Sequence, residues 1–108
     1  PFLYSKEDEG IRCFVNGWPT FIEFLPDVTI YTDGSCKDVR WKAVVVASAA
    51  AYQKGPDGKH RYAVIQVPRE QPQSVVAAEF LGLYMAVRLL PDVGAPKAVI
   101  AAGTVKRW

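Results

Sequence analysis

The stretch Val28-Thr-Ile-Tyr-Thr-Asp-Gly-Ser-Cys36 decides how the rest of this chain is interpreted. β-favouring residues run from Val28 to Thr32 directly into Asp-Gly-Ser, so the pattern predicts a strand that ends at Asp33 and then turns sharply. A carboxylate there is exposed at the end of a sheet and suits Mg²⁺, which is usually held by one or two carboxylates, water and substrate phosphates. The commonest use of the Asp-Gly pair is a plain turn after a strand, and both interpretations stay open from this stretch alone.

The composition indicates one soluble globular domain. The chain has 108 residues, of which 50% are hydrophobic and 22% are charged, enough for a single core. No apolar run approaches the ~18 to 20 residues of a membrane span and no leader peptide opens the chain, so we expect an intracellular protein with no membrane partner. Cys13 and Cys36 fit neither a zinc pattern nor a disulfide framework, and we expect free thiols. The net charge of +2 permits nucleic-acid binding without requiring it.

The first part of the chain is expected to be a connecting segment. Residues 1–26 form this lead-in, and residues 27–108 form the domain. Within the lead-in, Asn16-Gly17 lies between two apolar stretches and predicts a hairpin of Ile11–Val15 with Thr20–Phe24. The chain begins at Pro1 without a methionine and stops at Lys106-Arg-Trp108 without a capping signal, so we expect it to be cut from something longer.

The middle of the chain predicts an antiparallel hairpin. Residues 43–52 form an apolar run rich in valine and alanine, and residues 61–67 form a second strand. Between them, Lys54-Gly-Pro-Asp-Gly-Lys59 has the residues of a turn, with Pro56 presetting φ and Gly58 able to adopt a positive φ. Several basic residues cluster at this tip, including the only histidine, His60.

A helix follows, with Ser74 as its N-cap. It is expected over residues 75–90, and its predicted buried stripe consists of apolar residues at helical spacing: Val76, Phe80, Leu83, Val87 and Leu90. Glu79 is the only acid in this helix and is either a partly buried carboxylate or a surface acid. Gly82 indicates a close approach to another backbone. After a turn, residues 97–102 predict a strand that is parallel to the first strand and beside it, because helical crossovers are right-handed.

This order of elements resembles the ribonuclease H domain, especially the kind found with retroelement reverse transcriptases. The matching stretches are Ile30-Tyr-Thr-Asp-Gly-Ser-Cys36, Gln73-Ser-Val-Val-Ala-Ala-Glu79 and Ala98-Val-Ile-Ala-Ala-Gly-Thr-Val105. The resemblance covers about residues 27–108. It implies a three-layer α/β fold with a mixed sheet, in which the first three strands are antiparallel and the fourth is parallel to the first. The lead-in would connect to an upstream reverse-transcriptase domain of a polyprotein.

The resemblance also implies an activity and its residues. Family members hydrolyse the RNA strand of an RNA–DNA hybrid with two Mg²⁺ ions, or Mn²⁺ in their place. Asp33 would bridge the metals and Glu79 would hold one of them. The segment Gly34-Ser35-Cys36, together with Ser74, would lie near the sugar-phosphate backbone, so that the hybrid is recognised by its shape and its 2′-hydroxyls.

The chain departs from the family pattern at the third metal ligand. Ala102 stands where the family usually has an aspartate, and a methyl group offers no lone pair to a metal. Three explanations compete: an Asp-to-Ala change or local loss of residues, a natural copy without activity, or another acid in its place. The chain also ends before the family's last helix and fourth acid. The alternative function is therefore an inactive ribonuclease H-like module that binds nucleic acid or a neighbouring domain.

Overall fold

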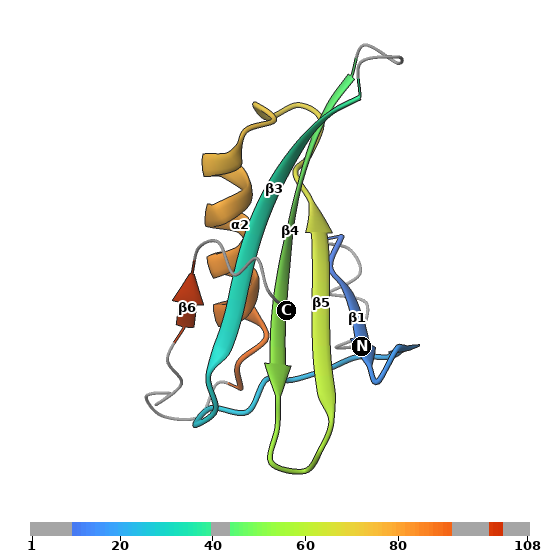
Figure 1. Ribbon diagram of the computed structural model, residues 1–108, viewed down its shortest axis with the longest axis vertical. Helices are drawn as coiled ribbons and strands as arrows, with labels where there is room; N and C mark the ends of the chain where they lie inside the picture. The colour runs from blue at the N-terminus through green and yellow to red at the C-terminus, as the bar shows by residue number, and fades with distance from the viewer. Residues whose placement is uncertain (1–9, 40–43, 92–99, 103–108) are drawn as a thin grey trace.

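The computed structural model describes residues 10–39, 44–91 and 100–102, which form a sheet with a helix on one face (Figure 1). The strands are β1 (Arg12–Val15), β2 (Trp18–Pro19), β3 (Ile30–Val39), β4 (Val44–Lys54), β5 (His60–Gln66) and β6 (Ile100–Ala102), and the helix is α2 (Val75–Arg88). Their order in the sheet is β2-β1-β5-β4-β3-β6. The first five strands in this order are antiparallel neighbours, and β6 pairs in parallel with β3. The result is a small α/β fold.

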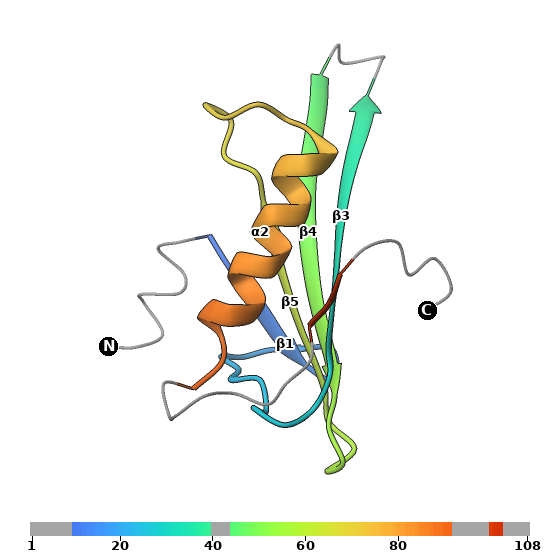
Figure 2. The same cartoon turned by 90° about the vertical axis from the view of Figure 1, so that its left-hand side faces the viewer.

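The sheet and α2 make two layers (Figure 2). A three-layer fold was expected, but the part of the chain that the structure describes builds no layer on the other face of the sheet. Side chains alternate between the faces, as they do in any strand. Ala47, Ala49 and Ala51 of β4 are buried toward α2, whereas the residues between them face away from it. We call the face without α2 the open face.

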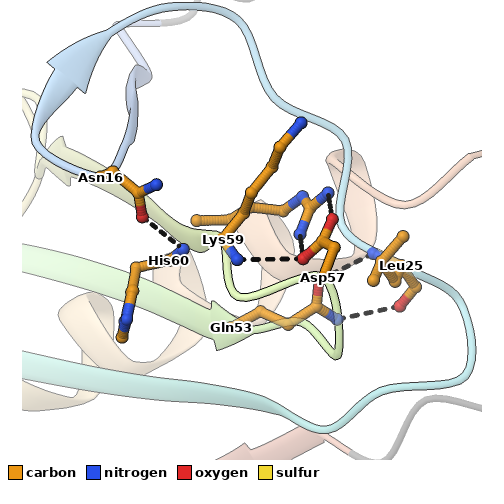
Figure 3. A network of polar contacts seen from close by, with 7 residues as sticks. Asn16, Leu25, Gln53, Asp57, Lys59 and His60 are labelled. Carbon is orange, nitrogen blue, oxygen red and sulfur yellow. Dashed lines mark hydrogen bonds and ion pairs between the residues drawn. The ribbon is translucent and has the colours of Figure 1, made fainter.

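The predicted β4–β5 hairpin is confirmed. The two strands pair from Ser48 with Gln66 to Lys54 with His60, and Gly58 has a φ of 80° in the connecting turn. The Asp57 carboxylate accepts hydrogen bonds from the Lys59 backbone nitrogen and from the Arg61 guanidinium (Figure 3). These contacts fix the turn by local hydrogen bonding.

A buried glutamine fastens the segment between β2 and β3 to the sheet. Gln53 is fully buried; its side-chain amide donates to the carbonyl oxygen of Leu25, and its Oε1 accepts from the Leu25 nitrogen (Figure 3). The amide also donates to the carbonyl oxygen of Val28. All the hydrogen-bonding capacity of this amide except one lone pair is therefore used on backbone groups. Gln53 thus fixes the chain just before it enters β3.

The lead-in segment is part of the same sheet. β1 pairs with β5, and Ile11, Ile22 and Phe24 belong to the main core. The Asn16-Gly17 turn is confirmed, with positive φ at both residues. The second strand of this hairpin is not residues 20–24 as predicted but β2. Thr20 still donates to the Cys13 carbonyl, but Phe24 donates to the Leu89 carbonyl at the end of α2 and not to β1.

The first sheet strand of the domain does not end at Asp33, which corrects the prediction of a turn there. β3 continues to Val39 and pairs with β4 along its whole length beyond Ile30, including Asp33 with Ala50 and Gly34 with Ala49. Cys36 continues the buried side of the strand, where it packs with Ala47 and Ala78. Gly34 therefore allows α2 to pack closely against β3 and does not form a turn.

The buried face of α2 is also different from the predicted one. Phe80 is 68% exposed, whereas Met85 is completely buried. The face against the sheet carries small residues at four-residue spacing: Ala78, Gly82 and Ala86. These small residues let the helix backbone approach the sheet closely, and that requirement outweighs the burial of larger side chains. Several larger side chains are consequently exposed on the outer side of α2: Val76, Phe80, Tyr84 and Val87.

Candidate functional site

Asp33 lies in the middle of β3 and not at its end. Its neighbours Thr32 and Gly34 face α2: Thr32 is buried, and Gly34 is packed against the helix. By alternation, the Asp33 side chain starts toward the open face. There it lines a hollow of about 560 Å³, together with Ser48 and Tyr52. Asp33 is half-buried, so the strand presents it to solvent from a rigid position.

Glu79 is held close to the same point of β3 by its backbone. A Cβ added to Gly34 would lie 2.7 Å from the Glu79 nitrogen and 2.7 Å from the Ala78 carbonyl carbon. Only glycine permits this approach, so α2 crosses β3 directly beside Asp33. Glu79 itself is exposed, which settles the question that the sequence left open.

The third position of the expected site lies on β6. This strand pairs with β3 from Ile30 opposite Ile100 to Thr32 opposite Ala102. Because β6 ends there, the outer edge of β3 is unpaired from Asp33 onward in the part of the chain that the structure describes. The backbone positions of Asp33, Glu79 and Ala102 therefore meet at one place on the edge of the sheet.

These positions do not make a complete metal centre. Asp33 starts on the open face and Glu79 on the face covered by α2, so the two carboxylates approach the edge of β3 from opposite sides. Among residues 10–39, 44–91 and 100–102, no group of three or more His, Cys, Asp or Glu side chains is placed to hold a metal ion. The described residues thus supply two carboxylates, not the set that two ions require.

The predicted nucleic-acid contacts are divided between the two faces. Ser35 is exposed on the open face, and its hydroxyl is 3.2 Å from that of Ser48. Cys36 points the other way, and its thiol donates to the Gln73 carbonyl at 3.6 Å. Ser74 is confirmed as the N-cap of α2, since its hydroxyl accepts from the Ala77 nitrogen. Of these residues, only Ser35 shares a face with Asp33.

Gln73 is a supporting residue that sequence reasoning did not single out. Its Oε1 accepts from the Ala47 nitrogen, and its Nε2 donates to the carbonyl oxygens of Val67, Pro68 and Gln71. These bonds tie the start of α2 to β4. Its position just before the N-cap is the only signal that the sequence gives for this role.

Comparison with protein families, curated proteins and solved structures found no match to this chain. No helix in the described ranges is both long enough and apolar enough to cross a membrane, and α2 has 14 residues. The functional assignment therefore rests on the residues of the chain and their arrangement.

Proposed function

We propose that this chain is a ribonuclease H-type domain that binds RNA–DNA hybrids and hydrolyses their RNA strand. The observation that supports the proposal is the packing of Gly34 on the Glu79 backbone, which puts the backbones of Asp33 and Glu79 close together while their side chains start on opposite faces of the sheet. These acids were assigned from separate motifs. A shared site requires the backbones of Asp33 and Glu79 to lie close together. If Asp33-Gly34 were only a turn, this proximity would not be needed.

The arrangement of strands supports the same proposal. β3, β4 and β5 are consecutive antiparallel strands, α2 follows them, and β6 returns beside β3 in parallel. This is the order that the resemblance implies. The ribonuclease H-like assignment of the fold is part of the proposal.

Asp33 and Glu79 would hold the divalent ion, Mg²⁺ or Mn²⁺, with water and the phosphates of the hybrid completing its coordination. When bound, such ions activate water and stabilise the leaving oxygen in phosphodiester hydrolysis. The side chain of Glu79 is long and exposed, and its backbone lies against Gly34 of β3, close to the edge that no described strand pairs beyond Thr32. It is therefore able to turn toward Asp33 around this edge.

A second function is favoured by the residue at the end of β6. Ala102 supplies no ligand at the strand position beside Asp33. A domain with two acids would bind a hybrid, or hold a neighbouring domain, without cutting. In either version we place the domain in a retroelement polyprotein, next to a reverse transcriptase and inside the cell.

The test is a hybrid-cleavage assay in Mn²⁺, with hybrid binding measured in parallel. If the chain is a nuclease, it cleaves the RNA strand, and Asp33→Asn and Glu79→Gln each reduce cleavage to the level without protein. If the second function holds, the chain binds the hybrid and leaves it intact. A chain that neither binds nor cleaves the hybrid would contradict both the nuclease and the hybrid-binding function.

A further inference from the structure

A row of aromatic residues crosses the open face of the sheet. Tyr31 on β3 is opposite Tyr52 on β4, Tyr52 is opposite Tyr62 on β5, and Tyr62 is opposite Phe14 on β1. Directly opposed residues on antiparallel strands have their side chains on one face, with Cβ atoms about 5 Å apart. Four strands therefore contribute one aromatic residue each to a continuous row.

The row is accessible and ordered. Tyr31 is 37% exposed and Tyr62 is 41% exposed. The rings of Phe14 and Tyr62 are tilted toward each other with centroids 6.2 Å apart. The Tyr52 hydroxyl is hydrogen-bonded to Nδ1 of His60 at 2.7 Å, which fixes its ring. Rigid exposed rings of this kind are good stacking partners, because little conformational freedom is lost when a flat ligand packs on them.

The hollow beside Asp33 adjoins this row. Its floor consists of small residues of β3 and β4: Gly34, Ser35, Ser48, Ala49 and Ala50. Tyr52, Tyr62 and Val64 also line it, and its volume is about 560 Å³. This volume is within the range of ligand pockets and is ample for a nucleobase with its sugar.

The charges on the open face favour an anionic occupant. By alternation, Arg12, Lys37 and Lys54 are on this face, and all three are exposed. Among the described strand residues of the open face, Asp33 is the only acid. A second copy of the chain would bring the same positive surface against itself. A chain of phosphates with flat bases matches both the cations and the aromatic row.

We propose that the open face binds single-stranded nucleic acid, with bases stacked on Tyr62 and Tyr52 and phosphates held by Arg12 and Lys54. Single strands expose the faces of their bases, whereas a duplex buries them in its own stack. The inference deepens the proposed function and rests on nucleic acid being the substrate class. It places a single-stranded segment that continues from the hybrid in the hollow that Asp33 lines.

The test is oligonucleotide binding by fluorescence anisotropy in EDTA, so that cleavage cannot interfere. The probes are labelled 12-mers of uridine and of deoxythymidine, which distinguish RNA from DNA. Tyr62→Leu should weaken binding of the preferred probe about tenfold, because one base loses its stacking partner. Tyr62→Phe keeps the ring and should bind within about twofold of the parent. Arg12→Gln should lower the salt dependence by about 0.7 in log–log slope.

Tyr84→Leu is the matched control, since Tyr84 is 47% exposed but lies on α2, away from the open face. Its binding should equal that of the parent. Equal losses in Tyr62→Leu and Tyr84→Leu would overturn the proposal, and so would absence of binding to both probes. So would self-association that Tyr62→Leu abolishes without any oligonucleotide binding. Because no metal is present, these outcomes are independent of hybrid cleavage, so failure of this inference is distinguishable from failure of the proposed function.

Discussion

Gly34 on β3 and Glu79 on α2 are in direct backbone contact, since a Cβ at position 34 would lie 2.7 Å from the Glu79 nitrogen. Gly34 directly follows the candidate metal ligand Asp33, and it also allows α2 to cross β3. One glycine links the packing of the two layers to the placement of both acids. The fold and the proposed site therefore depend on the same contact.

We expect Gly34→Ala to be destabilising. The added methyl group would meet backbone atoms of Ala78 and Glu79, which cannot move as a side-chain tip can. Overpacking of this kind costs about 1–3 kcal/mol, measurable by urea denaturation. Gly82→Ala is the control, because its Cβ would be 3.4 Å from the Thr32 Cβ and alanine favours a helix. Equal stability of the two variants would contradict the account of the crossing.

The orientation of α2 predicts unequal effects of two truncations. Met85 is completely buried, so Met85→Ala should lower the free energy of unfolding by about 2–5 kcal/mol. Phe80 is 68% exposed, and Phe80→Ala should change it by no more than about 0.5 kcal/mol. Thermal or urea unfolding measures both. A larger loss at Phe80 than at Met85 would show that the helix faces the other way.

Replacement of Gln53 should expose the importance of its hydrogen bonds. Gln53→Leu leaves part-buried backbone groups of Leu25 and Val28 without this side chain as a partner, at up to about 1–3 kcal/mol each. Gln66→Leu is the matched control because Gln66 is exposed on the neighbouring strand. The comparison is made by urea denaturation, and similar stabilities of the two variants would argue against a structural role for Gln53.

Asp57 should contribute to the acid sensitivity of the fold. The hydrogen bond from Arg61, followed by that from the Lys59 backbone, lowers the pKa of Asp57 below its ordinary value of 3.8. A lowered pKa in the folded state means that the stabilisation is present above the unfolded value and is lost as the pH falls through the folded one. Asp57→Asn should therefore flatten the stability curve below about pH 4. Arg61→Gln should do the same, and an unchanged curve in both variants would contradict this assignment.

The sequence was sufficient for the elements whose signals are local. The Asn16-Gly17 turn, the β4–β5 hairpin and the Ser74 cap follow from turn and capping chemistry, and each is present. The length of β3 and the buried face of α2 were not predictable in this way. Both depend on how closely two elements approach. The sequence Asp33-Gly34 is compatible both with a turn and with a glycine that a helix crosses. In α2, apolar residues occur on both sides of the helix, so the apolar pattern does not identify the buried face.

The candidate site was predictable only in part for the same reason. The motifs assigned Asp33 and Glu79, and the structure brings their backbones together. The face of the sheet toward which the Asp33 side chain points is defined only because β3 continues to Val39. The predicted turn at Asp33 gave no such information. The aromatic row depends on the register of four strands, and no single stretch of sequence contains it.

The most direct test of the central claim is a gain of cleavage at position 102. If Asp33, Glu79 and the end of β6 form one site, Ala102→Asp supplies the missing carboxylate beside Thr32, and RNA-strand cleavage of a hybrid in Mn²⁺ should rise well above that of the parent. Adding Asp33→Asn to this variant should remove the gain. An Ala102→Asp variant that binds the hybrid yet shows no more cleavage than the parent, or cleavage that persists after Asp33→Asn, would contradict the account.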